Sequence, residues 1–194
     1  GRGGMVHQAV VTGAFAAYLR RLLHDTSRQR DTVARMLATA HPGAGVTAFE
    51  VSDVRAIEEP VRVAIQGSIR QVAVPDGRTL RLRAVFEPEL LAARVPTSER
   101  RHALVTEHAY TRTAEVRYAL PPGYEVAHLP PRAALTTPLG DYALTAEIVP
   151  SAVAGAPDEV LVTTALVLRT VRVESADYDA FRAFCLAVDA AERE

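Results

Sequence analysis

The sequence predicts an α+β fold dominated by antiparallel sheet, with a β-sandwich that follows an N-terminal helical pair and precedes a C-terminal helix. Apolar residues recur at helical spacing near both ends of the chain, whereas between residues 46 and 173 they recur mainly at every second position. The chain has 194 residues, of which 48% are hydrophobic and 23% charged, so it can bury one sizeable core or two small ones.

The first 45 residues are expected to form a domain of one short strand and two helices. Residues 5–11 form a weak strand candidate, and the preceding GRGG is expected to be a flexible lead-in. The next segment, residues 14–25, has a helical apolar stripe. Its members are Phe15, Leu19, Leu22 and Leu23.

A second helix is expected to start near Thr26, because TSRQ has the form of a capping box with Gln29 as its second partner. Its buried residues are predicted to be Val33, Met36 and Leu37. The segment HPGAG at residues 41–45 is expected to end it.

The second predicted domain, residues 46–194, contains segments that alternate apolar and polar side chains as half-buried strands do. PDG at residues 75–77 is expected to be a turn and residues 151–158 an exposed loop. A subdivision of this domain near residues 89–101 stays open, because a proline interrupts a helical turn there. The alternating segments are residues 61–69, 80–86, 113–120 and 141–149.

The last third of the chain predicts a central strand and a terminal helix. Residues 159–173 are apolar or Thr on both faces as far as Leu168, which favours a strand covered on both sides. Ser175 is the expected helix cap. The residues that share the apolar face of this helix are Tyr178, Phe181, Cys185 and Val188.

Composition excludes several classes of function. The net charge is -1, which argues against a nucleic-acid partner, and no apolar run reaches the length of a membrane span. All 22 basic residues are arginine, so neither a P-loop nor a lysine Schiff base can form. The absence of Lys and Asn fits a GC-rich bacterial genome. Since the chain begins at Gly1 rather than at Met, we expect a piece of a longer protein.

Residue spacing indicates no catalytic constellation, so the chain is expected not to be an enzyme and to need no cofactor. Cys185, the single thiol, lies deep in an apolar helix face and is interpreted as a packing residue. The six histidines are scattered, and the closest pair, His102 and His108, would stand roughly 20 Å apart on an extended strand. The step from Gly67 to Ser68 lies in an alternating strand rather than in a nucleophile elbow.

Residues 120–142, LPPGYEVAHLPPRAALTTPLGDY, form the most distinctive stretch. Together with the long apolar strand and SADYDAFRAFCLAVDAAE, it resembles the C-terminal domain of unknown function that follows the catalytic core in bacterial transglutaminase-like proteins. The resemblance covers residues 100–194, and a looser one covers TGAFAAYLRR. The positions that carry it are Leu120, Pro121, Gly123, Leu129, Pro130, Gly140, Tyr142, Tyr178, Phe181 and Phe184.

The resemblance implies a non-catalytic accessory domain, because no segment resembles the core that holds the family's Cys, His and Asp. Its implied partner is an adjacent transglutaminase-like core, with a protein or cell-envelope component as a further partner. Relatives of this architecture favour an extracytoplasmic location. The alternatives are a carbohydrate-binding module, or a small hydrolase or metal-dependent enzyme with dispersed His and carboxylates. The sugar-binding alternative would use Tyr110, Tyr118, Tyr124 or Tyr142.

Four residues are kept as candidates for binding. His128 and Tyr124 lie in the distinctive stretch, where PPG is interpreted as a turn and most of the segment as scaffolding. Arg20 and Arg21 belong to an arginine cluster in the N-terminal helices, which is either a solvated face or a docking face.

Overall fold

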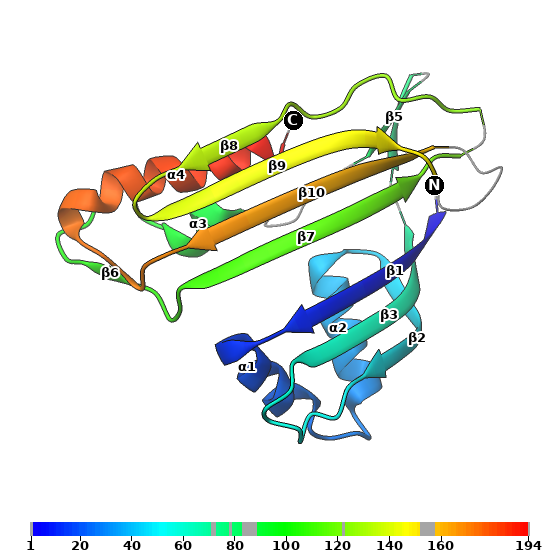
Figure 1. The fold of residues 1–194 in the computed structure, drawn as a ribbon, viewed down its shortest axis with the longest axis horizontal. Helices are drawn as coiled ribbons and strands as arrows, with labels where there is room; N and C mark the ends of the chain where they lie inside the picture. Colours follow the sequence, from blue (N-terminus) through cyan, green and yellow to red (C-terminus); the bar gives the residue numbers. More distant parts are fainter. Residues whose placement is uncertain are drawn as a thin grey trace. The chain divides into compact units, whose positions relative to one another are not determined.

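The computed structural model describes residues 2–70, 73–77, 79–82, 89–121, 123–151 and 158–193. The chain divides into two compact units, Gly1–Arg83 and Ala84–Glu194. Each unit has its own main sheet (Figure 1). Each also has its own buried hydrophobic residues. The predicted class, α+β with mainly antiparallel sheet and a C-terminal helix, is confirmed.

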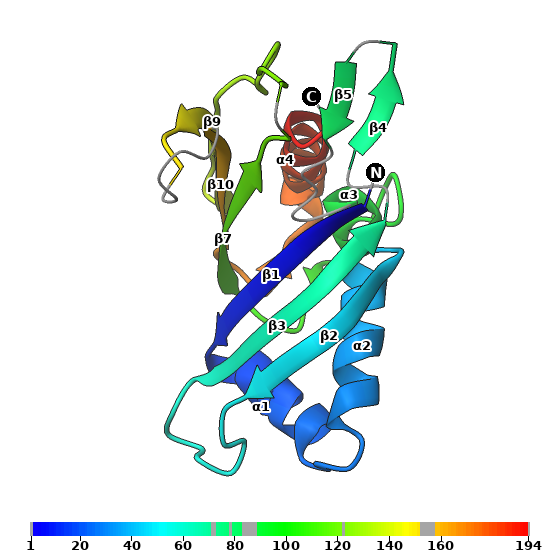
Figure 2. The same cartoon turned by 90° about the vertical axis from the view of Figure 1, so that its right-hand side faces the viewer.

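The unit Gly1–Arg83 is a three-stranded antiparallel sheet with two helices against one face (Figure 2). Its strand order is β1-β3-β2, so both β2 and β3 share a sheet with β1. The expected domain boundary after residue 45 therefore falls within β2. The elements are β1 (Arg2–Val11), α1 (Gly13–Leu23), α2 (Gln29–Ala40), β2 (Ala44–Val51) and β3 (Val61–Arg70).

The core of this unit forms where β3 meets the two helices. Strand β3 alternates as predicted, and it buries Val61, Val63 and Ile65. The predicted helix faces are partly wrong, because Phe15 is 43% exposed and Met36 is 36% exposed. The buried face of α1 instead includes Ala16, a small residue that the apolar pattern does not predict there. The buried helix residues are Ala16, Leu19, Leu23, Thr32, Val33 and Leu37.

The expected capping box at Thr26 is wrong, since α2 begins at Gln29. The turn before it is organised by Asp25, whose Oδ1 accepts hydrogen bonds from Ser27 N at 3.0 Å and from Ser27 Oγ at 2.6 Å. Gln29 Nε2 donates to Leu23 O at 2.7 Å and so ties the start of α2 to the end of α1. The Asp25 side chain thus occupies the turn in which Thr26 would have capped.

The glycine-rich N-terminus is a strand and not the expected flexible lead-in. Strand β1 begins at Arg2, and Gly3 and Gly4 pair with Ile69 and Ser68 of β3. This long-range pairing supplies the backbone hydrogen bonds that local composition does not predict. The ribbon of β4 (Ala73–Asp76) and β5 (Thr79–Leu82) follows β3, and the predicted turn between its strands contains Gly77 at φ 59°. Residues 83–86 of the predicted second strand lie outside the described residues.

The unit Ala84–Glu194 contains a four-stranded antiparallel sheet in the order β7-β10-β9-β8. Strand β10 lies between two neighbours, as its apolar sequence predicts, and Leu168 is opposite both Tyr110 and Gly140. Its burial alternates strictly, so one face of the sheet is buried and the other half-buried, and the expected cover on both sides of this strand is wrong. The strands are β7 (Tyr110–Ala119), β8 (Ala133–Thr136), β9 (Gly140–Val149) and β10 (Glu159–Leu168). The predicted loop at residues 151–158 falls largely on residues 152–157, which lie outside the described residues.

A helix and extended chain cover the buried face of this sheet in place of the second sheet that a sandwich would supply. Helix α4 (Tyr178–Ala191) covers one end, where Phe181 and Val188 join a core with Tyr142 and Leu166. The distinctive stretch covers the other end, where apolar residues of the segment after β7 pack against Val160 and Val162. These covering residues are Leu120, Val126 and Leu129.

The segment at residues 89–101, near which a subdivision of the domain was considered, is bound to α4. Helix α3 (Leu90–Arg94) begins after Glu89, a non-glycine residue at φ 63°. The Asp189 carboxylate of α4 accepts hydrogen bonds from Leu90 N at 2.8 Å and from Leu91 N at 3.1 Å. Leu90 is 1% exposed, so this contact lies in the core. Asp189 therefore supplies from another helix the acceptor that α3 lacks locally.

The end of the chain differs from the prediction at one point. Ser175 does not cap the last helix but starts a short 3₁₀ turn, Ser175–Asp177, which leads into α4. The two-residue strands β6 (Leu104–Val105) and β11 (Arg172–Val173) pair with each other, and β11 comes just before this 3₁₀ turn. Among the described residues, no helix has the length and apolar character needed to cross a membrane.

Candidate functional site

Cys185 is part of the hydrophobic core, as its sequence position predicts. Its exposed fraction is 0%, and it lies in the cluster with Tyr178, Phe181 and Val188. Burial, reinforced by the nearby Asp189 carboxylate, raises the pKa of this thiol from 9.0 to about 12. Because the thiolate is the nucleophilic form, Cys185 is unsuited to covalent catalysis.

We expect alkylation to report this burial directly. At pH 8 the folded chain should react with iodoacetamide far more slowly than the urea-unfolded chain, because the raised pKa lowers the thiolate fraction on the order of a thousandfold. Since the folded pKa lies above the unfolded one, Cys185 should also reduce stability as pH rises from about 9 towards 12. Equal alkylation rates in the two states would contradict the assignment.

The histidines occupy separate places in the fold. His102 and His108 lie on either side of β6, in segments that are not strands. In the part of the chain that the structure describes, no group of three or more His, Cys, Asp or Glu side chains is placed to hold a metal ion.

The tyrosines suggested for sugar stacking do not form one exposed platform. Tyr142 is 2% exposed and its hydroxyl donates to Glu192 Oε1 at 3.2 Å. Tyr118 packs beside Val160 in the covered face, where burial raises the pKa of its hydroxyl to about 12. Tyr110 lies 5.3 Å below the Arg94 guanidinium, measured to the ring centroid. Only Tyr124 of this predicted set is among the exposed large side chains, at 44%.

Tyr124 and His128 lie in the segment that crosses the covered face. Tyr124 N donates to Pro121 O at 3.2 Å, and Gly123 has φ 82°, so the chain reverses direction at the predicted place, although Pro122 lies outside the described residues. His128 is exposed, whereas Leu129 beside it packs into the core. The structure thus separates the two candidates, which face solvent, from the neighbouring residues that hold the segment in place.

Arg20 and Arg21 have different surroundings. The Arg20 guanidinium donates to Ala56 O at 3.1 Å and to Glu59 O, and so holds the loop between β2 and β3 against α1. Arg21 is exposed, with its guanidinium 5.6 Å from the centroid of the Tyr18 ring. Arg21 is therefore the more exposed of the two, whereas the guanidinium of Arg20 is bound by backbone carbonyl groups.

The half-buried face of the four-stranded sheet is a surface that the sequence did not single out. Its centre is shallow and lined mainly by small side chains from three adjacent strands, including Thr113 of β7, Ala143 of β9 and Ala165 of β10, with Glu115 of β7 at its border. Thr145 Oγ1 and Thr163 Oγ1 lie 2.5 Å apart across β9 and β10. Thr and Ala at every second position of these strands are the available signal, which by itself predicts only a sheet. We call this surface the open face.

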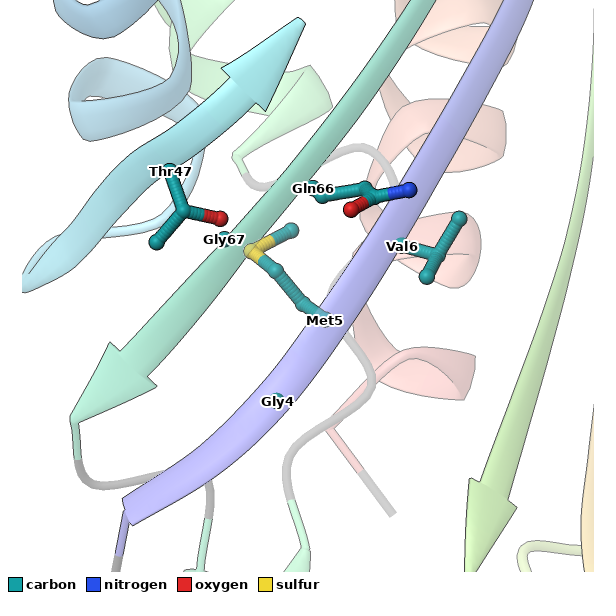
Figure 3. A pocket seen from close by; sticks show the side chains of 6 residues that line it. All are labelled: Gly4, Met5, Val6, Thr47, Gln66 and Gly67. Atoms are coloured by element: carbon teal, nitrogen blue, oxygen red, sulfur yellow. The ribbon is translucent and has the colours of Figure 1, made fainter.

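A second hollow lies in Gly1–Arg83, on the face of the sheet opposite the helices (Figure 3). Its volume is about 290 Å³, and Gly4 and Val6 of β1, Gln66 of β3 and Thr47 of β2 contribute to its lining. The register between β2 and β3 shifts between Val46 and Ala48, so Thr47 forms a bulge at one side.

Comparison with protein families identifies the family to which the C-terminal part of the chain is similar. The model of the family described as Domain of Unknown Function with solved-structure structure (DUF3858) matches residues 80–194. The chain belongs to this family. The DUF3858 match begins in β5 and includes the open face, the α3 segment and α4, so these are parts of one family domain. No curated protein and no solved structure matches the chain.

Proposed function

We propose that the chain is a non-catalytic accessory domain of a transglutaminase-like protein, which docks through the open face onto the catalytic domain. The observation that carries this proposal is the open face itself, where Ala and Thr occupy the centre of the sheet. Small side chains allow the backbone of a partner to approach closely, and a flat sheet can pack against another ordered domain. The resemblance of residues 100–194 to the domain that follows a transglutaminase-like core supports the choice of partner.

Charged pairs beside the centre of the open face and at one end of it support a docking role. Arg117 Nε lies 2.9 Å from Glu115 Oε1 on β7, where Glu115 borders the centre, and Arg169 pairs with Asp141 near the start of β9. Stable interfaces commonly place such polar groups around a centre that excludes water. The burial of Cys185 supports the accessory role, because the thiolate used in transglutaminase-like chemistry would have to come from the partner.

A binding titration tests this function. We expect the chain to bind a transglutaminase-like catalytic domain encoded in the same gene or beside it, as measured by isothermal titration calorimetry. Thr163→Arg, at the centre of the open face, should weaken binding at least about tenfold, which corresponds to about 1.4 kcal/mol. The added guanidinium would prevent close packing of the two surfaces.

Leu186→Arg is the matched control, because it adds the same charge to the exposed side of α4, where Leu186 is 49% exposed. This variant should bind like the parent chain. Absence of binding, or equal affinity of Thr163→Arg and the parent, would contradict docking through the open face. For the extracytoplasmic location that the resemblance implies, fractionation of the source cells is the corresponding test.

A further inference from the structure

Among the residues that the structure describes, strand β1 lies at the edge of its sheet and has β3 as its one neighbour. Its ten residues pair with β3 in one continuous register, from Arg2 opposite Arg70 to Val11 opposite Val61. An edge strand presents an outward row of backbone N–H and C=O groups that can pair with another extended chain. Natural edge strands are commonly blunted by Pro, Lys or a bulge, and β1 has neither residue type nor a register shift.

Two side chains of β1 add an apolar character to this edge. Val6 is 72% exposed and Val10 is 62% exposed, and both lie on the face opposite the helices. Because side chains of paired strands contact one another on a shared face, these valines favour a partner with apolar residues at alternate positions.

The hollow beside Val6 provides a place for one larger side chain. Gly4 borders the hollow, and a Cβ atom built at Gly4 meets no other atom within 4 Å (Figure 3). A bulky residue on a strand paired with β1 could lean across Gly4 into this space, because aromatic side chains commonly cover glycine in a neighbouring strand. The hollow is shallow and open to solvent, so an aromatic ring could lie across it.

The charge of this region indicates what else the partner carries. The unit Gly1–Arg83 has twelve arginines and seven acidic residues, which gives it a formal charge of +5. Two exposed arginines of β3, Arg62 and Arg70, stand opposite Val10 and Arg2, near the two ends of β1. Carboxylates at both ends of a bound strand would therefore meet positive charge.

We propose that β1 binds an acidic protein segment in extended conformation, which adds a fourth strand to the sheet and places a large apolar side chain over Gly4. Backbone hydrogen bonds would supply affinity, and the hollow and the arginines would supply specificity. This interaction is independent of docking through the open face, because it uses the other unit of the chain.

A synthetic peptide tests the proposal with the whole chain. The probe is a fluorescein-labelled strand of alternating Val and Thr with one central Phe and a Glu at each end, and fluorescence anisotropy measures its binding. We expect saturable binding that Gly4→Leu weakens at least about tenfold, because the new side chain fills the hollow. Val6→Glu should have a similar effect, whereas Val74→Glu, at a 58% exposed valine outside this sheet, should have none.

Further variants and measurements make the test independent of any one variant's folding. Arg62→Glu combined with Arg70→Glu leaves the hollow intact and should weaken the probe at least about fivefold. Hydrogen exchange should slow at β1 amides when the probe is present. Absence of saturable binding, or equal affinity of the Gly4→Leu and parent chains, would overturn the proposal. So would sedimentation showing that a second copy of the chain occupies this edge and that Val6→Glu abolishes the dimer.

Discussion

Replacing Asp189 by Ala should lower the free energy of unfolding of Ala84–Glu194 by about 3 kcal/mol, because two backbone N–H groups lose their acceptor. Leu90 N lies in the core, where water cannot replace the lost carboxylate at low cost. The docked α3 segment should then loosen from α4. Urea unfolding followed by near-ultraviolet circular dichroism measures the effect, since five of the six tyrosines lie in this unit.

Two control variants separate this contact from a general effect of charge. Asp189→Asn retains an oxygen acceptor for one of the two N–H groups, so we expect a loss of about half the size. Asp179→Ala removes an exposed carboxylate from the first turn of the same helix and should cost less than about 1 kcal/mol. If Asp189→Ala were no more destabilising than Asp179→Ala, the assigned role of Asp189 would be wrong.

Gly140→Val should destabilise the same unit by about 3 kcal/mol or more, because Gly140 has no room for a side chain. A Cβ atom there would lie 2.5 Å from Val167 O and 3.2 Å from the Phe184 ring. The first contact is with the backbone of the central strand β10, which cannot move without breaking its pairing with β7 and β9. The same urea titration should show an earlier transition.

Gly45→Ala provides the contrast within a sheet, because the nearest atom to its Cβ would be Ser68 Oγ at 4.0 Å. This variant should fold with little change in the tyrosine signal. A Gly140→Val chain as stable as the parent would contradict the close approach of β9, β10 and α4 that positions the covered face.

The strands were predictable because their patterns are local. Val61, Val63 and Ile65 occupy every second position, and a half-buried strand is the structure that satisfies such a pattern. The central place of β10 followed equally from apolar residues on both of its faces.

Features that depend on distant partners were not predictable in this way. The strand at Arg2–Val11 exists through its pairing with residues 61–70, and the glycines there carry no strand preference of their own. The α3 segment has only a short helical pattern, and its order comes from Asp189, almost a hundred residues later. The predicted start of α2 is wrong for a related reason, because the Asp25 side chain organises the turn that Thr26 was expected to cap.

The candidate site residues also divide into those that local sequence predicts and those that depend on distant partners. Cys185 could be assigned to the core from its place in an amphipathic helix, and its burial follows. Arg20 could not be distinguished from Arg21, since the carbonyl groups that bind it come from a distant loop. The open face could not be predicted, because Thr and Ala are ordinary strand residues and only the pairing of β7, β9 and β10 brings them together on one surface.

Docking through the open face is tested most directly by methyl NMR of the chain during titration with the transglutaminase-like catalytic domain. Ala143, Ala165 and Thr145 line the open face, whereas Val162 and Leu166 lie in the covered face. We expect the first set of methyl resonances to shift or broaden in proportion to complex formation, while the second set stays close to its free positions. Unchanged open-face methyl resonances at saturating catalytic domain would contradict the proposed function.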